Sequence, residues 1–510
     1  MNFFRAIRNK NESRKVAAIT SILGTYSSLI VNIINGIIMI PLFLHFFGSD
    51  LYGTWLATAG MISMFALLEG GINQVITQRL ARSYSRGTHV TFRLNLSSGI
   101  IINTGVILCM FLLGLIFSTL FPFFIHTNKS NYNVIGNSII LASLGSALTL
   151  YQNTLFSPFY AWQKVFIATI VSNGTSILGI IINLILLYAG YGIISISISI
   201  FINGLVGFLL AIFFVKKEMH ARYKSNWFIF KFKHIQLVLK KCIPLYLNTI
   251  VSTVSGNIEP VLIASYINST AVVIYNVTFK LVSLSTLPIS AIAGSIIGSA
   301  SHLFGENNKV KQREIVHSLI SIQAIISVIM LSVVVMVNKD FVSIWVGDKF
   351  YGGDLLTILF VFQILSNTRF NLFTSLIQAT GEFKITSIGG IVASITKLLF
   401  IFFLIMNFKN ITILPLATFL SIFSFAFFYY PIRMAGFLRD NKINWYGIKE
   451  IIIGIILVSI LLFFPYPVFN WFQLGIKSFL FAFIAFFTLY LLSKNVRFSL
   501  IYLKKSFFKG

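Results

Sequence analysis

Long apolar runs follow one another along this chain, and they constrain its fold more than any other feature. Each run of about 20 apolar residues is long enough to cross a bilayer as a helix, and each is bounded by charged or turn residues. We identify fourteen such runs, at residues 17–46, 52–79, 94–122, 134–161, 165–188, 192–215, 242–266, 271–301, 315–338, 354–379, 384–406, 411–436, 450–465 and 474–493. Hydrophobic residues make up 57% of the chain and charged residues only 10%, against about 25% in soluble domains. The sequence therefore predicts an all-α, polytopic membrane protein.

Lys and Arg residues are sorted between alternate connections of this topology. The N-terminus, every second connection and the C-terminal tail hold 31 of the 39, and the other connections hold five: Lys129, Lys339, Lys349, Lys409 and Lys477. Because basic residues are retained on the cytoplasmic side of a membrane, we expect both termini to be cytoplasmic. The net charge of +26 is spread over short loops, so we assign it to the inner membrane surface and not to nucleic-acid binding.

Motifs of the common catalytic and nucleotide-binding sites do not occur in the chain. It has no glycine-rich phosphate loop, no H-E-x-x-H or C-x-x-C pair and no G-x-S-x-G turn. Cys109 and Cys242 fall in spans far apart in the chain, so neither a disulfide nor a metal site is expected. The longest outward connection, about residues 339–353, leaves no room for an external catalytic domain. We therefore expect a transporter without a cofactor, and not an enzyme.

A basic connection and a weak internal repeat divide the chain into halves. Residues 216–241 carry eight Lys or Arg residues, as in a linker that either lies on anionic headgroups or forms an ordinary basic loop. At an offset of 220 residues, two sets of small polar residues correspond: Ser28, Asn32, Asn35 and Gly36 with Asn248, Ser252, Ser255 and Gly256. Each set occupies one helix face, which either packs closely against another helix or lines a wet cavity.

These features predict two similar lobes of six helices each. Residues 1–215 form the N-terminal lobe, 216–241 the basic cytoplasmic linker and 242–437 the C-terminal lobe. Residues 438–510 add two further helices and a basic cytoplasmic tail. Paired lobes of this kind are typical of transporters that hold their substrate at a central site between the repeats.

Five ionisable side chains lie inside the apolar runs, where a charge is expensive and is usually kept for a function: Glu69, Glu259, Lys280, Arg369 and Lys397. Glu259 and Lys280 lie equally far from the turn at residues 268–270, so they are level in the membrane. They either form an ion pair or act directly in transport. Glu69 has no cation level with it on the neighbouring spans. It is a protonatable site for ion coupling, a distant partner of one cation, or a neutral acid buried in helix packing.

Arg369 and Lys397 are also level, about the turn near residue 383, but both are positive. Each needs an anion in a low-dielectric environment, so the pair predicts an anionic substrate. Lys397 shares a small, polar helix face with Ser387 and Ser394. Arg369 lies nearly opposite the polar face of its own helix, which leaves its direction open.

Four short motifs resemble those of a known family. They are Phe47-Gly48-Ser49-Asp50-Leu51-Tyr52-Gly53-Thr54-Trp55, Gln78-Arg79-Leu80-Ala81-Arg82, Trp345-Val346-Gly347 and Gln378-Ala379-Thr380-Gly381. In this order the chain resembles the O-antigen flippases, which are polysaccharide transporters of the multidrug, oligosaccharidyl-lipid and polysaccharide (MOP) exporter superfamily. The resemblance covers essentially the whole chain, and it departs from a frequent pattern at Glu259, which Pro260 follows here.

The resemblance implies a V-shaped, alternating-access protein of the bacterial inner membrane with two six-helix bundles. Such proteins move an undecaprenyl-pyrophosphate-linked oligosaccharide from the cytoplasmic to the periplasmic leaflet during lipopolysaccharide or other surface polysaccharide synthesis. It also implies membrane lipids and other polysaccharide assembly proteins, such as a polymerase or chain-length regulator, as partners. The family has no nucleotide site, and we expect coupling to H⁺ or Na⁺.

Charge and hydrogen-bonding capacity together suggest which residues face such a substrate. We expect the diphosphate and glycan cavity to include Arg369, Lys397, Lys280, Asn32, Asn35, Ser252 and Ser255, with Glu69 and Glu259 in ion coupling or charge pairing. A peptidoglycan-precursor (lipid II) flippase needs the same cationic cavity and is the nearest alternative. A drug or cation exporter and a membrane glycan polymerase or ligase fit the charges and the short outward loops less well.

Overall fold

The computed structural model describes residues 10–125, 129–223, 228–305, 308–440, 447–461, 468–493 and 496–497. Within these ranges helices are joined by short connections, and no strand occurs. Eleven of the described helices are long and apolar enough to cross a membrane. The prediction of an all-α, polytopic membrane protein is confirmed.

The difference between fourteen predicted spans and eleven has three sources. The span at 17–46 and the first part of the span at 52–79 lie in one helix, α2 (Lys10–Met64), which kinks at Gly48, and they count as one of the eleven. The span at 242–266 lies in α8 (Phe232–Tyr266), which is not among the eleven. The described part of the span at 450–465 is the short helix α15 (Ile448–Leu461).

Contacts divide the chain into two compact units, Met1–Val272 and Val273–Gly510. The sequence suggested a division at residues 216–241. The contacts place it one helix later, because α8 packs on α2, α3 and α4. The second half of the expected linker is the start of α8, with Ile235 and Val238 buried.

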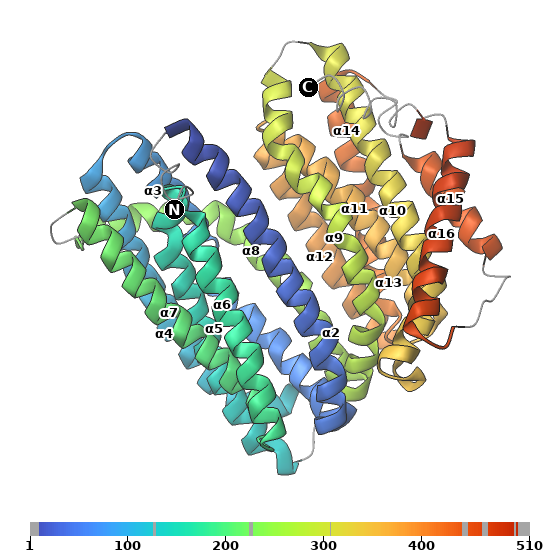
Figure 1. Cartoon of the computed structure of the whole chain (residues 1–510), viewed down its shortest axis with the longest axis horizontal. Coiled ribbons are helices and arrows are strands. Elements are labelled where there is room, and N and C mark those ends of the chain that lie inside the picture. The colour runs from blue at the N-terminus through green and yellow to red at the C-terminus, as the bar shows by residue number, and fades with distance from the viewer. Residues whose placement is uncertain are drawn as a thin grey trace. The chain divides into compact units, whose positions relative to one another are not determined.

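Unit 1 is a helical bundle whose elements appear from blue to green in Figure 1. It contains α2, the 3₁₀ turn η2 (Phe65–Leu68), α3 (Ile72–Ser85), α4 (His89–Phe124), α5 (Tyr132–Ala161), α6 (Val165–Tyr188), α7 (Ile194–Tyr223) and α8. The helices α5 and α7 pack along their lengths, and α4 packs on α5. Small residues permit this close approach, since a Cβ at Gly204 would lie 2.2 Å from the carbonyl oxygen of Gly145.

The turn after Phe47 explains several residues of the first motif. Gly48 has φ +74°, a conformation that favours glycine, and it kinks the chain within α2. A Cβ at Gly53 would lie 1.8 Å from the carbonyl oxygen of Ser269, so only glycine fits this contact. Thr54 Oγ1 donates to Ser269 Oγ at 3.0 Å. The motif therefore fixes the start of the second predicted span against the turn that follows α8.

Unit 2 appears from green to red in Figure 1. Its helices are α9 (Ser269–Gly305, which begins in unit 1), α10 (Lys309–Trp345), α11 (Asp354–Ala379), α12 (Phe383–Asn407), α13 (Ile413–Ser421), α14 (Phe427–Leu438), α15 and α16 (Trp471–Leu492). A π-helical turn, Ile422–Ala426, joins α13 to α14 in one span. The core of the unit gathers around buried Phe373 and Tyr430.

The last two helices pack on α10 and are held partly by charged side chains. Lys477 Nζ of α16 lies 2.6 Å from Asp340 Oδ2 of α10, and Lys477 is 6% exposed. Ser493 Oγ donates to Glu450 Oε1 of α15 at 2.7 Å, and Glu450 is fully buried. The charge pattern assigns Lys477 to an outward connection, but the residue lies inside α16, where Asp340 supplies the negative charge that lets it be buried.

Candidate functional site

A polar seam runs between α2 and α6 in unit 1. At one end the helices touch, since a Cβ at Gly24 would lie 2.5 Å from Thr169 Cγ2. One turn further, Ser28 Oγ donates to Asn173 Oδ1 at 2.6 Å and Asn173 Nδ2 donates to Ser27 Oγ at 2.7 Å. Here Ser27, Ser28 and Asn173 hydrogen-bond one another across the helix interface.

Beyond these contacts the seam opens into a cavity of about 240 Å³ between α2, α6 and α7. We call it the asparagine pocket. Its lining residues are Val31, Asn32, Asn35, Phe43, Ser176, Gly179, Ile180, Asn183, Ile196, Ser199, Ile200 and Asn203. Gly179 makes room for it, because a Cβ there would already contact Asn203 Cβ at 3.4 Å.

The asparagine pocket is polar but uncharged. None of its lining residues is Asp, Glu, His, Lys or Arg. Asn183 is 6% exposed, and its side-chain oxygen accepts no hydrogen bond from the described residues. Asn35 and Asn203 are half-buried, and Asn32 is exposed. Asn32 and Asn35 both line this pocket, and their role in substrate binding stays a prediction.

A second group of amides in unit 1 hydrogen-bonds to other side chains of the protein, and only the side-chain oxygen of Asn103 in this group accepts no hydrogen bond from the described residues. Thr154 Oγ1 of α5 donates to Asn73 Oδ1 of α3 at 2.5 Å, and Asn103 Nδ2 of α4 donates to the same oxygen at 3.4 Å. Asn103 and Thr154 are buried, and Asn73 Nδ2 donates to the carbonyl oxygen of Leu150 at 3.4 Å. We call Asn73, Asn103 and Thr154 the amide network.

Glu69 lies beside this network, at a break between η2 and α3 that hydropathy does not predict. Its carboxylate accepts from the backbone N–H of Asn73 at 2.6 Å and from that of Gly71 at 3.2 Å. Gly70 and Gly71 have φ values of +52° and +79°. A carboxylate at the start of α3 is favoured by the free N–H groups and by the helix dipole. Glu69 therefore has a capping role, and its proposed role in ion coupling stays a prediction.

Three other residues of the predicted site lie on α8, in unit 1. Glu259 and Ser255 are buried, and Ser252 is exposed with its hydroxyl donating to the carbonyl oxygen of Thr249. Lys280 is half-buried in α9. The division between the units falls between Glu259 and Lys280, so their ion pair remains a prediction.

Arg369 and Lys397 are both buried in unit 2, at 3% and 8% exposure. The guanidinium carbon of Arg369 lies 5.1 Å from the ring centre of Phe373 and 5.2 Å from that of Phe427. A Cβ on Gly447, just before α15, would lie 3.5 Å from Arg369 Nη1. Arg369 thus points toward α14 and the start of α15, which answers the question of its direction. Lys397 lies on α12, which packs on α13 and the π-helical turn.

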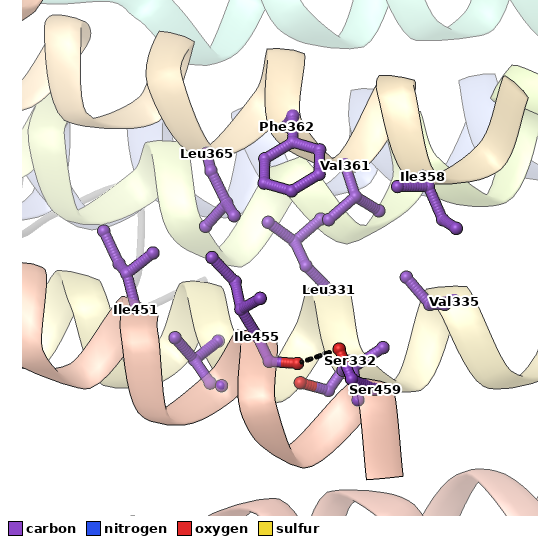
Figure 2. A pocket seen from close by; sticks show the side chains of 13 residues that line it. Leu331, Ser332, Val335, Ile358, Val361, Phe362, Leu365, Ile451, Ile455 and Ser459 are labelled. Atoms are coloured by element: carbon purple, nitrogen blue, oxygen red, sulfur yellow. Dashed lines mark hydrogen bonds between the residues drawn. The ribbon is translucent and has the colours of Figure 1, made fainter. Parts of the chain in front are cut away.

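Next to Arg369 lies an apolar groove of about 180 Å³ between α10, α11 and α15. Figure 2 shows Ile358, Val361, Phe362 and Leu365 of α11 facing Ile451, Ile455 and Ser459 of α15. Arg369 follows Leu365 by one helical turn, and Gly447 precedes Ile451 by one turn. The groove therefore ends close to a buried positive charge.

Sequence reasoning missed Asn183, Asn203 and the apolar groove. A signal for the two asparagines existed, since Ser176, Gly179 and Asn183 follow helical spacing, as do Ser199 and Asn203. It resembles the stripe that singled out Asn32 and Asn35. The groove had no such signal, because α10, α11 and α15 are apolar on several faces.

Comparisons with known proteins agree with this fold. The family model described as "Polysaccharide biosynthesis protein" matches residues 47–352. A search of curated protein sequences returned no match.

Three solved structures share the fold at low sequence identity. Lipid II flippase MurJ in its inward closed conformation has a TM-score of 0.68 and 16% identity, over 91% of this chain and 98% of that chain. An inward-facing MATE family multidrug transporter of the MOP superfamily has a TM-score of 0.64 and 12% identity, over 80% and 94%. A MOP superfamily transporter from Pyrococcus furiosus has a TM-score of 0.57 and 13% identity, over 86% and 98%. This chain belongs to the polysaccharide biosynthesis protein family and has the fold of the MOP superfamily of membrane transporters.

Proposed function

We propose that this protein is a flippase that moves a polyprenyl-diphosphate-linked oligosaccharide, the repeat unit of a surface polysaccharide such as O-antigen, across the bacterial inner membrane. Family membership supports the polysaccharide part of this proposal. The fold supports alternating access between the two sides of the membrane, with no catalytic step.

One observation carries the lipid-diphosphate part. In unit 2 an apolar groove lies within one helical turn of the buried cation Arg369. A polyprenyl diphosphate presents the same two features next to each other, a hydrocarbon chain and a concentrated negative charge. Burying a cation among membrane helices is expensive, so Arg369 and Lys397 are retained for a function such as neutralising a phosphate.

The coupling of transport to H⁺ or Na⁺ belongs to the same proposal. The chain carries no phosphate-binding loop that would supply ATP energy. A gradient can drive a conformational cycle only if the ion binds the two conformations differently. Among the acids of the predicted spans, we assign this role to Glu69 and Glu259.

Lipid II is the second candidate substrate, because the solved structure of lipid II flippase MurJ shares the fold over nearly the whole of both chains. Deletion in the native host separates the two. We expect surface polysaccharide to disappear while the cells continue to grow. Loss of viability without a suppressing mutation would identify the peptidoglycan precursor instead.

The same host tests the two cations. Arg369→Ala and Lys397→Ala should each abolish polysaccharide export at normal membrane levels, because each removes a positive charge from the proposed diphosphate site. The variant Arg369→Lys should retain little polysaccharide export, since Lys lacks the planar, two-point hydrogen bonding of Arg and its stacking on Phe373 and Phe427. Export at the wild-type rate by both alanine variants would contradict the proposed diphosphate contact.

A further inference from the structure

We propose that the asparagine pocket of unit 1 is a binding subsite for one uncharged sugar ring. The inference rests on the proposed function, because the ring would belong to the oligosaccharide of the transported lipid. It adds a location within a single unit, between α2, α6 and α7, and a chemical selectivity.

The first argument is unused hydrogen-bonding capacity. Among the described residues, the side-chain amides of Asn32, Asn35, Asn183 and Asn203 make no hydrogen bond, and all four line the same cavity. Asn183 is 94% buried with its oxygen unpartnered, which is costly for an amide among membrane helices. The amides of Asn73, Asn103 and Asn173, elsewhere in unit 1, each hydrogen-bond another side chain. The four pocket amides are therefore free to bind a ligand.

The second argument is the type of group that fits. An amide offers two donors and an acceptor, and a sugar hydroxyl both donates and accepts, so the two match in either direction. The pocket has no carboxylate, the usual ligand of a divalent metal cation, and no Lys or Arg to balance a phosphate or an acidic sugar. An uncharged, hydroxyl-rich ligand remains.

The third argument is size and shape. At about 240 Å³ the cavity is smaller than the roughly 300–1,000 Å³ of most drug-sized ligand sites. It can hold a single six-membered ring but not an oligosaccharide. Phe43, Ile180 and Ile196 give it apolar walls against which the C–H faces of a sugar ring can pack. The rest of the glycan must lie outside this pocket.

The test uses the full-length protein in proteoliposomes with lipid-linked oligosaccharide extracted from the native host. The variant Asn35→Leu/Asn183→Leu keeps the branched shape of each side chain and removes two amides from two helices. The matched control is Asn133→Leu, an exposed asparagine in the first turn of α5 that does not line the pocket. We expect at least a ten-fold slower flipping rate for the double variant and a wild-type rate for the control.

A second readout does not depend on transport. Saturation-transfer NMR of the purified protein with methyl glucoside and N-acetylglucosamine should give signals that the double variant loses, whereas glucuronate should give none with either protein. If the double variant flips at the wild-type rate, or if it keeps the neutral-sugar signals, the pocket is not a sugar subsite. If the wild type flips no faster than protein-free vesicles but the sugar signals depend on Asn35 and Asn183, the subsite stands and the proposed flippase function fails.

Discussion

The amide network and the asparagine pocket use the same residue type in the same unit for different ends. In the amide network, Asn73 and Asn103 meet each other and Thr154, so α3, α4 and α5 are held together. In the asparagine pocket, four amides converge on a cavity and make no hydrogen bond among the described residues. The hydrogen-bond partners of a buried asparagine therefore decide whether it indicates helix packing or a binding site. Substitution in the network should therefore cost stability, and substitution in the pocket should cost transport.

Asn73→Leu should have the largest effect on stability. It removes the hydrogen bonds that Asn73 makes with Thr154, Asn103 and the carbonyl oxygen of Leu150, although Asn103 Nδ2 still donates to the carbonyl oxygen of Gly99 and Thr154 to that of Leu150. We expect a loss of about 2 kcal/mol, since each lost hydrogen bond costs about 0.5–1.5 kcal/mol. Thermal unfolding in detergent measures it. An unfolding temperature of Asn183→Leu that falls as far as that of Asn73→Leu would break the comparison.

Removal of the cap beside the network should have the next largest effect. Glu69→Ala deletes both acceptors at the start of α3, and we expect a loss of about 1 kcal/mol. Glu69→Gln keeps an acceptor oxygen and should lose less. If the Glu69→Ala and Glu69→Gln variants both unfold at the wild-type temperature, the capping role of Glu69 is wrong.

The same glutamine variant tests ion coupling. We predict that an imposed pH gradient changes the flipping rate of wild-type proteoliposomes and that Glu69→Gln removes this response. Coupling at Glu69 is contradicted if wild-type flipping ignores the gradient or if the variant responds in the same way. In either case Glu69 only caps α3.

Gly179→Ala sharpens the comparison from the side of the pocket. The new Cβ would lie 3.4 Å from Asn203 Cβ and 3.5 Å from the carbonyl oxygen of Ser199, which are ordinary contacts. Stability should change by less than about 1 kcal/mol and in the favourable direction, because alanine is the better helix former. The pocket narrows, so flipping should slow by a few-fold while the amount of folded protein is unchanged. Unaltered flipping would argue that no ligand enters there.

The smallest expected effect concerns His234, which lies beside another hydrogen-bonded amide, that of Asn95. Its oxygen accepts from Arg79 Nε at 2.8 Å and lies 2.9 Å from His234 Nε2, which precedes the apolar span of α8. Burial and the positive charges of Arg79 and Lys231 lower the pKa of His234. The folded state then binds fewer protons than the unfolded state, whose histidine pKa is about 6.5.

The neutral His234 of the folded protein contributes stability that is complete above the unfolded pKa of histidine. This contribution is lost as pH falls through the lowered folded pKa. The unfolding temperature of the wild type should therefore drop between pH 7 and pH 5 by more than that of His234→Gln. Parallel pH profiles of the two proteins would contradict this origin.

Hydropathy predicted the helical, polytopic fold because spans of about 20 apolar residues are visible residue by residue. It could not show the break at Glu69, because the adjacent Gly70 and Gly71 leave the span apolar while their positive φ values interrupt the helix. It also could not show that Lys477 is buried, since Asp340 is 137 residues away in the sequence.

For the candidate site, charge inside an apolar span was a sound guide to burial of Arg369 and Lys397. The direction of Arg369 depends on Phe427 and Gly447, which approach it only in the folded chain. Asn183 and Asn203 were overlooked because an uncharged amide stands out less than a charge. Helices distant in sequence decide whether the amide of an asparagine finds a hydrogen-bond partner. The asparagine pocket could therefore not be predicted from the sequence.

The most direct test of this account is a cryo-EM map of the protein in nanodiscs with lipid-linked oligosaccharide extracted from the native host. We predict density for one sugar ring against Asn35, Asn183 and Asn203 in the asparagine pocket, and its absence from a map of Asn35→Leu/Asn183→Leu prepared in the same way. Glycan density bound elsewhere in the wild-type protein, with the asparagine pocket empty, would contradict the account.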